Sequence, residues 1–243
     1  MVARRGPALP TRFLLPDGPR RGIVVNLAER RLFYFPARGG SVTTFPVGVA
    51  VGGLDSPLGN TRIIRKEANP PWYPPPSIRS ERPGLPRVIR PGPDDPLGAY
   101  ALVLGWPDYL IHGTNKPDGV GRNVSHGCLH LYPEDIAALY RAVPVGTPVR
   151  VISEEADVQW ADGALFVAAY PNKRQADALD SGDAVVPELP PKLVERVAAA
   201  AGNRDGGIDW QAVERAGLAR SGIPIEVVPT GAADPTVPVE HPS

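Results

Sequence analysis

Proline and glycine restrict the fold of this chain more than any other residue types, because 31 prolines and 26 glycines are spread over 243 residues. Proline lacks the backbone N–H that helices and sheets use, and glycine interrupts regular elements. Long helices are therefore disfavoured, and short strands joined by turns are expected. The sequence predicts a mostly β fold.

Apolar runs bounded by turn residues predict the individual strands. Residues 22–27 and 31–35 flank a short polar break and predict a hairpin. Further strands are expected at 41–51, 61–66, 98–105, 108–112, 147–153 and 164–170, the last two closing the sheet, with Asp162-Gly163 as a turn. Pro133 and the two acids after it suit the first turn of a helix. Two more helices are expected at 192–201 and 210–220.

Residues 67–97 are rich in proline and predict a long ordered loop. Loops of this length inside a compact domain are usually functional. Trp72 and Tyr73 in this loop either wall one side of a cleft or pin the loop to the sheet, and the sequence favours neither interpretation.

Neither charge nor hydropathy indicates a nucleic acid or a membrane as the partner. The 26 basic and 26 acidic residues give a formal net charge of zero, and no basic segment stands out. No window reaches the ~18 apolar residues of a transmembrane helix. With 42% hydrophobic and 21% charged residues, the chain can bury a core in one main domain with an appendage.

One stretch of the chain carries most of its reactive side chains. Residues 111–115 and 123–131 contain the only cysteine and three of the four histidines. A cysteine thiol has a pKa of about 8.5, so a nucleophilic cysteine needs a base or a positive field. His112 precedes Cys128 by a loop long enough to fold back, and Gly127 permits a tight bend in which backbone N–H groups converge on an oxyanion. The hypothesis is acyl transfer through a thioester.

Other interpretations use the same residues. A lone cysteine is most often a small buried apolar residue, although the Ser-His-Gly-Cys context favours a nucleophile. A zinc-binding module would use His112, His126, Cys128 and His130, but the alternation of the last three departs from the spacing of common zinc pairs. Water can resolve a thioester as well as an amine can, so a cysteine peptidase or carboxypeptidase of cell-wall peptides is a further alternative.

The pattern His-Gly-Thr-Asn, a glycine-containing loop, and then Ser-His-Gly-Cys resembles the L,D-transpeptidase catalytic domain, the YkuD-like family of peptidoglycan cross-linking enzymes. Segments similar to its ErfK-type envelope branch are Gly22–Leu27, Asn69–Tyr73, Pro91–Tyr100 and Tyr132–Ile136. The resemblance covers roughly residues 15–170. One position departs from it, because that branch has arginine where this chain has His130.

The resemblance implies an L,D-transpeptidase-like β-sandwich with one supporting helix and a small C-terminal α-helical appendage. It implies that Cys128 is the nucleophile, His112 the general base and His126 an auxiliary residue, without a metal or an organic cofactor. The residues expected at the oxyanion and substrate are Gly127, Gly113, Ser125, His130, Trp72 and Tyr73. A catalytically idle relative would have no need to retain both His112 and Cys128.

The same resemblance implies the partners and the location. The donor would be a peptidoglycan stem peptide, and the acceptor an amine of another stem or of an outer-membrane lipoprotein lysine. The expected location is the periplasm, although no export signal is visible in residues 1–21. The expected organisation is a linker or remnant of a cell-wall-binding module over 1–20, a catalytic domain over 21–171, a helical appendage over 172–229 and a disordered tail over 230–243.

Overall fold

The computed structural model describes residues 13–37, 39–50, 56–125 and 127–230, which form two compact units. The large unit comprises Pro19–Ser153 and Lys173–Ala184. The small unit contains the other described segments, which are 13–18, 154–172 and 185–230. The chain therefore leaves the large unit after Ser153 and returns to it once before it enters the small unit again.

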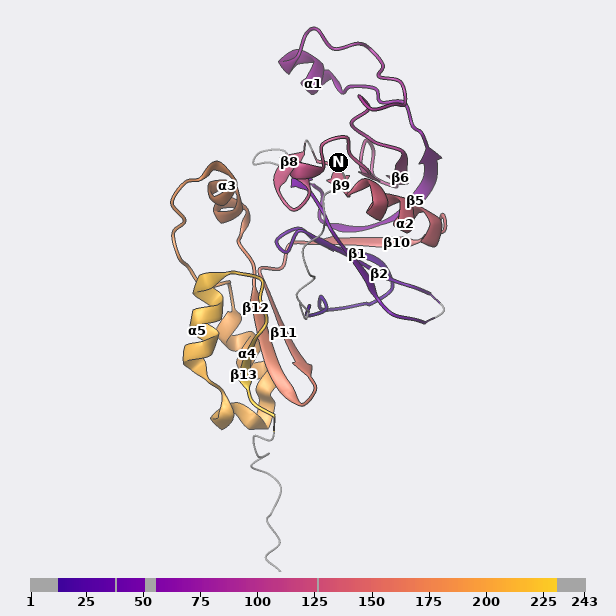
Figure 1. Ribbon diagram of the computed structural model, residues 1–243. Helices are drawn as coiled ribbons and strands as arrows, with labels where there is room; N and C mark the ends of the chain where they lie inside the picture. Colours follow the sequence, from indigo (N-terminus) through magenta and orange to yellow (C-terminus); the bar gives the residue numbers. More distant parts are fainter. Residues whose placement is uncertain (1–12, 38, 51–55, 126, 231–243) are drawn as a thin grey trace, which may run out of the picture. The chain divides into compact units, whose positions relative to one another are not determined.

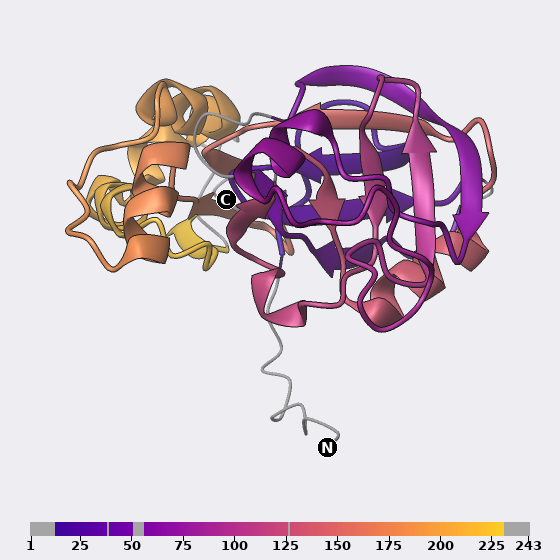
Figure 2. The same ribbon diagram turned by 90° about the horizontal axis from the view of Figure 1, so that it is seen from above.

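An eight-stranded sheet forms the large unit, in the order β3-β2-β1-β10-β5-β6-β7-β9. Its strands are β1 (Gly22–Asn26), β2 (Arg31–Phe35), β3 (Thr43–Pro46), β5 (Gly59–Ala68), β6 (Tyr100–Leu104), β7 (Leu110–His112), β9 (Leu129–His130) and β10 (Pro148–Ile152). The pairs β1–β10 and β7–β9 are parallel and the other pairs are antiparallel. Figure 2 shows the strands curling around a shared interior. The predicted mostly β fold is confirmed.

The predicted hairpin at 22–35 is also confirmed, because β1 and β2 pair antiparallel from Gly22 opposite Phe35 to Asn26 opposite Arg31. Every residue of β1 is buried. This follows from its position between β2 and β10, since a central strand covered on both faces reads as a continuous apolar run.

Two short strands stand outside this sheet. β4 (Val49–Ala50) and β8 (Asn123–Ser125) pair with each other in a separate parallel ladder. β8 leads directly to the segment that carries Cys128.

The predicted helix after Pro133 is α2 (Pro133–Ala142), and its ends suit the helix dipole. Glu134 and Asp135 lie in its first turn and Arg141 in its last. Ile136 and Leu139 are fully buried in the core of the large unit. Within the part of the chain that the structure describes, every helix is too short or too polar to cross a bilayer.

The predicted long loop lies between β5 and β6 and contains a short helix, α1 (Pro76–Glu81), that the sequence analysis missed. Figure 1 shows α1 at the outer end of this loop. Trp72 and Ile89 exchange backbone hydrogen bonds of 2.9 and 2.8 Å across the loop. Closer to β6, the buried Asp95 accepts a hydrogen bond from the Leu97 N–H at 2.9 Å. The loop is therefore fixed at both positions.

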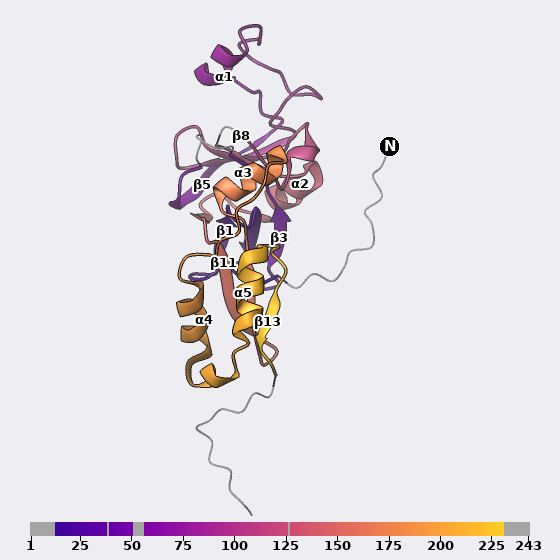
Figure 3. The same ribbon diagram turned by 90° about the vertical axis from the view of Figure 1, so that its left-hand side faces the viewer.

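The small unit contains the two predicted C-terminal helices and a sheet of its own. Its elements are β11 (Ala156–Ala161), β12 (Ala164–Ala169), α4 (Leu193–Ala201), η2 (Gly202–Gly207), α5 (Trp210–Ala219) and β13 (Ile225–Val228). The strand order is β11-β12-β13, and α4 and α5 lie along these strands (Figure 3). Asp162 and Gly163 both have positive φ, at 50° and 81°, which the predicted tight hairpin turn requires.

The prediction that 164–170 closes the large sheet is wrong. β12 lies between β11 and β13, and its buried side chains pack in the core of the small unit with α4 and α5. The pattern of a buried strand was read correctly, but an apolar run does not specify its neighbours. The two units are defined by the contacts within each of them, and such contacts do not test whether either unit folds alone. The domain boundary predicted at residue 171 therefore stays a prediction.

Candidate active site

Parallel pairing of β7 with β9 brings the two halves of the motif together. Ile111 lies opposite Leu129 and His112 opposite His130. Paired residues share a face of the sheet, and so do residues two apart on one strand. Cys128, one residue before β9, is therefore directed to the same side as His130 and His112. All three side chains line one cleft of about 1020 Å³.

His112 is held in one orientation and one tautomer. Its side chain is 3% exposed, and its Nδ1 lies 2.6 Å from the Gly113 carbonyl oxygen. A carbonyl oxygen only accepts, so Nδ1 carries the proton and Nε2 has the lone pair. Burial, with a smaller effect of His130, lowers the pKa of His112 to about 3, against hydrogen bonds to the backbone of Gly113 and Leu97. The imidazole is neutral at physiological pH.

Cys128 is half-buried, and its Sγ lies 3.6 Å from the Asp108 carbonyl oxygen, to which the thiol donates. Burial raises the pKa of the thiol. The charge of Asp108 adds to this effect, whereas a hydrogen bond from the Leu110 backbone opposes it. The resting sulfur is therefore a thiol, which would have to lose its proton in any attack by the sulfur.

Hydroxyl groups hold Ser125, Gly127 and Cys128, which are here called the nucleophile loop. The buried Ser125 Oγ donates to the Cys128 carbonyl oxygen at 2.7 Å and accepts from the Gly127 N–H at 3.2 Å. Ser56 Oγ donates to the Gly127 carbonyl oxygen at 2.7 Å. Because the Gly127 N–H is directed to Ser125, the role of Gly127 in an oxyanion hole stays a prediction.

Two glycines are required by this geometry. Gly127 has φ of +118°, and a Cβ there would lie 2.9 Å from Tyr109 Cε1. A Cβ on Gly113 would lie 3.0 Å from Ile136 Cγ2 of α2 and 3.2 Å from the Leu97 carbonyl oxygen. Gly113 therefore lets α2 approach the strand end while its own carbonyl orients His112.

The remaining predicted site residues fall into two groups, which are those that line the cleft and those that lie outside the described residues. Trp72 and Tyr73 line the cleft with Cys128, and Tyr73 is 68% exposed. His130 also lines it, with its ring centroid 4.6 Å from that of His112. His126 lies outside the described residues, so its auxiliary role stays a prediction.

Sequence reasoning missed a second hollow of about 620 Å³ beside the first. Trp72, Arg82, Pro96 and His130 line both hollows. The second is additionally lined by charged side chains, among them Lys116, Asp118 and Arg122. These charges were visible in the sequence, but nothing there showed that the loop containing Trp72 would face the loop containing Lys116.

Among the described residues, no group of three or more His, Cys, Asp and Glu side chains is placed to hold a metal ion. The zinc alternative also uses His126, which lies outside them.

The chain is similar to known proteins over most of its length. The model of the YkuD family, described as the L,D-transpeptidase catalytic domain, matches residues 20–151. The probable L,D-transpeptidase YbiS of Escherichia coli K12 is 37% identical over 225 residues, which are 90% of this chain and 72% of YbiS. The probable L,D-transpeptidase ErfK/SrfK of the same strain is 42% identical over 151 residues, which are 60% of this chain and 48% of that protein.

Among solved structures, L,D-transpeptidase 3 from Mycobacterium tuberculosis aligns over 55% of this chain and 61% of its own, with 22% identity and a TM-score of 0.41. The family model covers more than half of the chain, and YbiS aligns with nearly all of it. The predicted family resemblance is thereby confirmed: the chain belongs to the L,D-transpeptidase catalytic domain family.

Proposed function

We propose that this protein is a peptidoglycan L,D-transpeptidase of the cell envelope, located in the periplasm, in which Cys128 is the nucleophile and His112 the general base. The observation that carries the proposal is the pair of neutral groups in one cleft. His112 has its lone pair on Nε2, and Cys128 is a protonated thiol lining the same cleft. In such a pair, the thiol proton moves to the imidazole only as the sulfur attacks a substrate carbonyl.

The proposed reaction has two halves. The Cys128 sulfur attacks the carbonyl at the L-centre of diaminopimelate in a tetrapeptide stem while His112 Nε2 takes the thiol proton. The C–N bond to D-alanine breaks, its nitrogen receives that proton, and a thioester remains on Cys128. An acceptor amine then attacks the thioester, and the sulfur leaves and regains a proton.

The cleft is suited to a peptide substrate. It is lined by residues of the loop that contains Trp72 and Tyr73, together with His112 and Cys128. Arg82 lines both hollows and offers a cation to a substrate carboxylate. The acceptor would be an amine of a second stem or a lipoprotein lysine, reached without metal or cofactor.

Mass spectrometry of the products tests the proposal. The protein is incubated with a disaccharide-tetrapeptide, alone and with a lysine-containing lipoprotein peptide. Loss of D-alanine together with a stem dimer or a stem–lysine adduct supports transfer, whereas a tripeptide alone would indicate a carboxypeptidase. No loss of D-alanine would contradict the proposal. Loss of activity in EDTA that zinc restores would favour the zinc alternative.

A further inference from the structure

The strand that leads to the nucleophile loop has little support from the sheets. β8 is three residues long, and its ladder partner is β4, which contributes Val49 and Ala50. β4–β8 is separate from the eight-stranded sheet. An isolated two-stranded ladder is marginally stable. The position of Asn123–Ser125, from which the chain leads to Cys128, therefore also depends on contacts outside the sheets.

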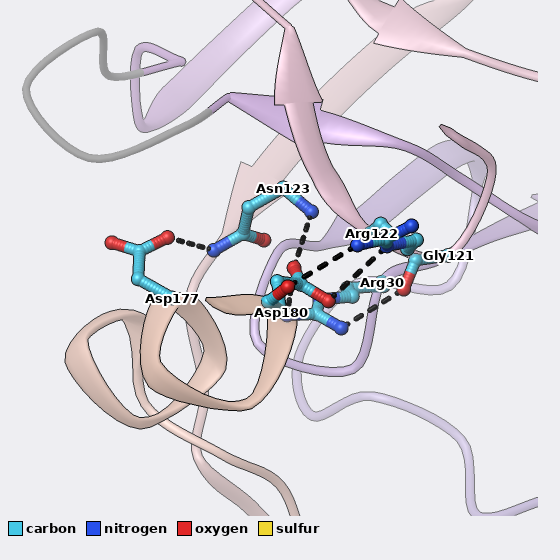
Figure 4. Close-up of polar contacts among 6 residues, drawn as sticks. All are labelled: Arg30, Gly121, Arg122, Asn123, Asp177 and Asp180. Carbon is cyan, nitrogen blue, oxygen red and sulfur yellow. Dashed lines mark hydrogen bonds and ion pairs between the residues drawn. The ribbon is translucent and has the colours of Figure 1, made fainter. Parts of the chain in front are cut away.

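Those contacts come from α3 (Lys173–Ser181), a helix of the large unit that follows β12 in the chain (Figure 4). Asp180 Oδ2 accepts the backbone N–H of Asn123 at 2.9 Å. Asp177 Oδ1 accepts the Asn123 side-chain amide at 2.6 Å. The two carboxylates thus hold both the backbone and the side chain of the first residue of β8.

Asp180 also binds two arginines close to this contact. Its carboxylate accepts from Arg30 Nη2 at 3.3 Å and Arg122 Nε at 3.5 Å, and its carbonyl oxygen accepts from Arg122 Nη2 at 3.3 Å. Arg30 in turn donates to the Gly121 carbonyl oxygen at 2.9 Å. Arg30 ends the turn between β1 and β2, so Asp180 links this hairpin to residues 121–123 (Figure 4).

Asp177 and Asp180 do not stabilise the helix α3 itself. Asp180 lies in the last turn of α3, where a negative charge opposes the helix dipole. Asp177 and Asp180 are three residues apart and lie on one face, where like charges repel. Bonds to guanidinium groups and to a backbone N–H offset both effects. The acids therefore serve contacts outside the helix.

We propose that α3 is a positioning element of the active site, in which Asp177 and Asp180 fix the start of β8 and so the place from which the nucleophile loop presents Cys128. These two carboxylates with Arg30, Arg122 and Asn123 are called the α3 clamp. The path is short, because Asn123 is two residues from Ser125, whose hydroxyl holds the Cys128 carbonyl oxygen. The clamp also directs Arg122, which lines the second hollow. The inference rests on the proposed function, since it assigns a catalytic effect to the clamp.

The first experiment measures acylation of Cys128 by a carbapenem in Asp180→Ala, Asp177→Ala and Asp180→Asn. The matched control is Asp183→Ala, an exposed aspartate just beyond the same helix. Each variant is assayed well below its own unfolding midpoint, with the folded fraction checked by circular dichroism. The maximal acylation rate and the half-saturating concentration are determined separately, and alkylation by iodoacetamide reports thiol access alone.

If the α3 clamp positions Cys128, its loss should change the maximal acylation rate much more than the half-saturating concentration or the alkylation rate. Asp180→Ala should lower the maximal acylation rate by about tenfold or more, because small misplacements of reacting groups are costly, while the half-saturating concentration and the alkylation rate stay within about threefold. Asp180→Asn should recover part of the rate, since an amide oxygen can still accept the Asn123 N–H. Unchanged acylation by folded Asp180→Ala would overturn the proposal, and so would an effect confined to the half-saturating concentration or an equal loss in Asp183→Ala.

Hydrogen–deuterium exchange tests the clamp without any reaction. Asp180→Ala should speed exchange in peptides covering 122–129, leave β1 and β10 unchanged, and differ in both respects from Asp183→Ala. Equal protection of 122–129 in parent and variant would reject the clamp. Failure of the parent to acylate would instead count against the proposed function, so the two failures are distinguishable.

Discussion

His112 and Cys128 are both kept uncharged by their surroundings. Burial lowers the pKa of the imidazole to about 3 and raises the pKa of the thiol. A thiolate–imidazolium pair, as found at some reactive cysteines, would require both shifts to have the opposite sign. In the proposed mechanism, proton transfer therefore occurs during the attack on the substrate.

The neutral pair predicts a flat pH profile. His112 stays deprotonated down to a pH near its lowered pKa, so the maximal acylation rate by a carbapenem should change little between pH 5 and 8. A base with the ordinary pKa of about 6.5 would lose about 30-fold by pH 5. His112→Gln should lower the rate by about a hundred- to ten-thousand-fold, as expected for a general base. A parent profile that falls with an apparent pKa near 6.5 would contradict the account.

His130 is the residue whose charge should affect substrate affinity. The unperturbed pKa of an imidazole is about 6.5, whereas arginine is a permanent cation. In the parent, apparent affinity for a tetrapeptide should fall between pH 5.5 and 7.5 as the cation is lost. His130→Arg should flatten this fall and still acylate Cys128. Superimposable KM profiles in the two proteins would reduce His130 to a structural neighbour of His112.

The residues proposed to react could be selected from the sequence, but their electrostatics could not be predicted. The motif containing His112 and Cys128 is local and specific, so a resemblance was sufficient to select them. The pKa of His112 depends on burial under loops that no spacing reveals. Ser125 was expected at the oxyanion or substrate, and this role stays a prediction; its hydroxyl bonds to the Gly127 N–H and to the Cys128 carbonyl oxygen.

At the scale of elements, the nucleophile loop depends on one backbone conformation. Gly127→Ala adds both a strained φ and a contact of 2.9 Å with Tyr109, whereas Gly146→Ala adds strain at φ of +89° with no atom within 4 Å of the new Cβ. Strain of this kind costs about 1–3 kcal/mol. Both variants should lose stability in urea, but Gly127→Ala alone should lose most carbapenem acylation. Equal activity in the two folded variants would show that the loop tolerates a different conformation.

Elements with strong local signals were predicted and those set by distant pairing were not. Pro133 with two acids marked the start of α2, and the break between 22–27 and 31–35 marked a hairpin. The strand at 164–170 was given the wrong sheet because pairing partners are not encoded in an apolar run. The helix α3 was not predicted, and the partners of its acids, Arg30 and Asn123, are far away in the sequence.

At the scale of the whole molecule, the small unit contains a titrating group of its own. Asp157 is fully buried in β11, and the Tyr170 hydroxyl donates to its Oδ2 at 2.9 Å. Burial raises the pKa of Asp157 to about 7, although the bond from Tyr170 opposes the shift. The folded state thus holds a proton that the unfolded state releases between about pH 4 and 7.

This linkage predicts that the small unit loses stability as pH rises from about 4 to 7. Asp157→Asn removes the charge, so at pH 8 it should be more stable than the parent by an amount on the order of a few kcal/mol, with a smaller difference at pH 5. Urea unfolding followed by tryptophan fluorescence measures this, with Trp72 and Trp106 of the large unit replaced by phenylalanine so that Trp160 and Trp210 report alone. Asp162→Asn, an exposed aspartate of the same hairpin, is the control. A parent that is more stable than Asp157→Asn at pH 8 would contradict the raised pKa.

The central claim is that one thioester, on Cys128, carries the reaction, and rapid-quench mass spectrometry with a disaccharide-tetrapeptide tests it most directly. The parent should show one adduct whose mass equals the substrate without D-alanine, located by peptide mapping on the segment containing Cys128. Cys128→Ala should show no adduct and release no D-alanine. Release of D-alanine by Cys128→Ala at the rate of the parent would contradict the account.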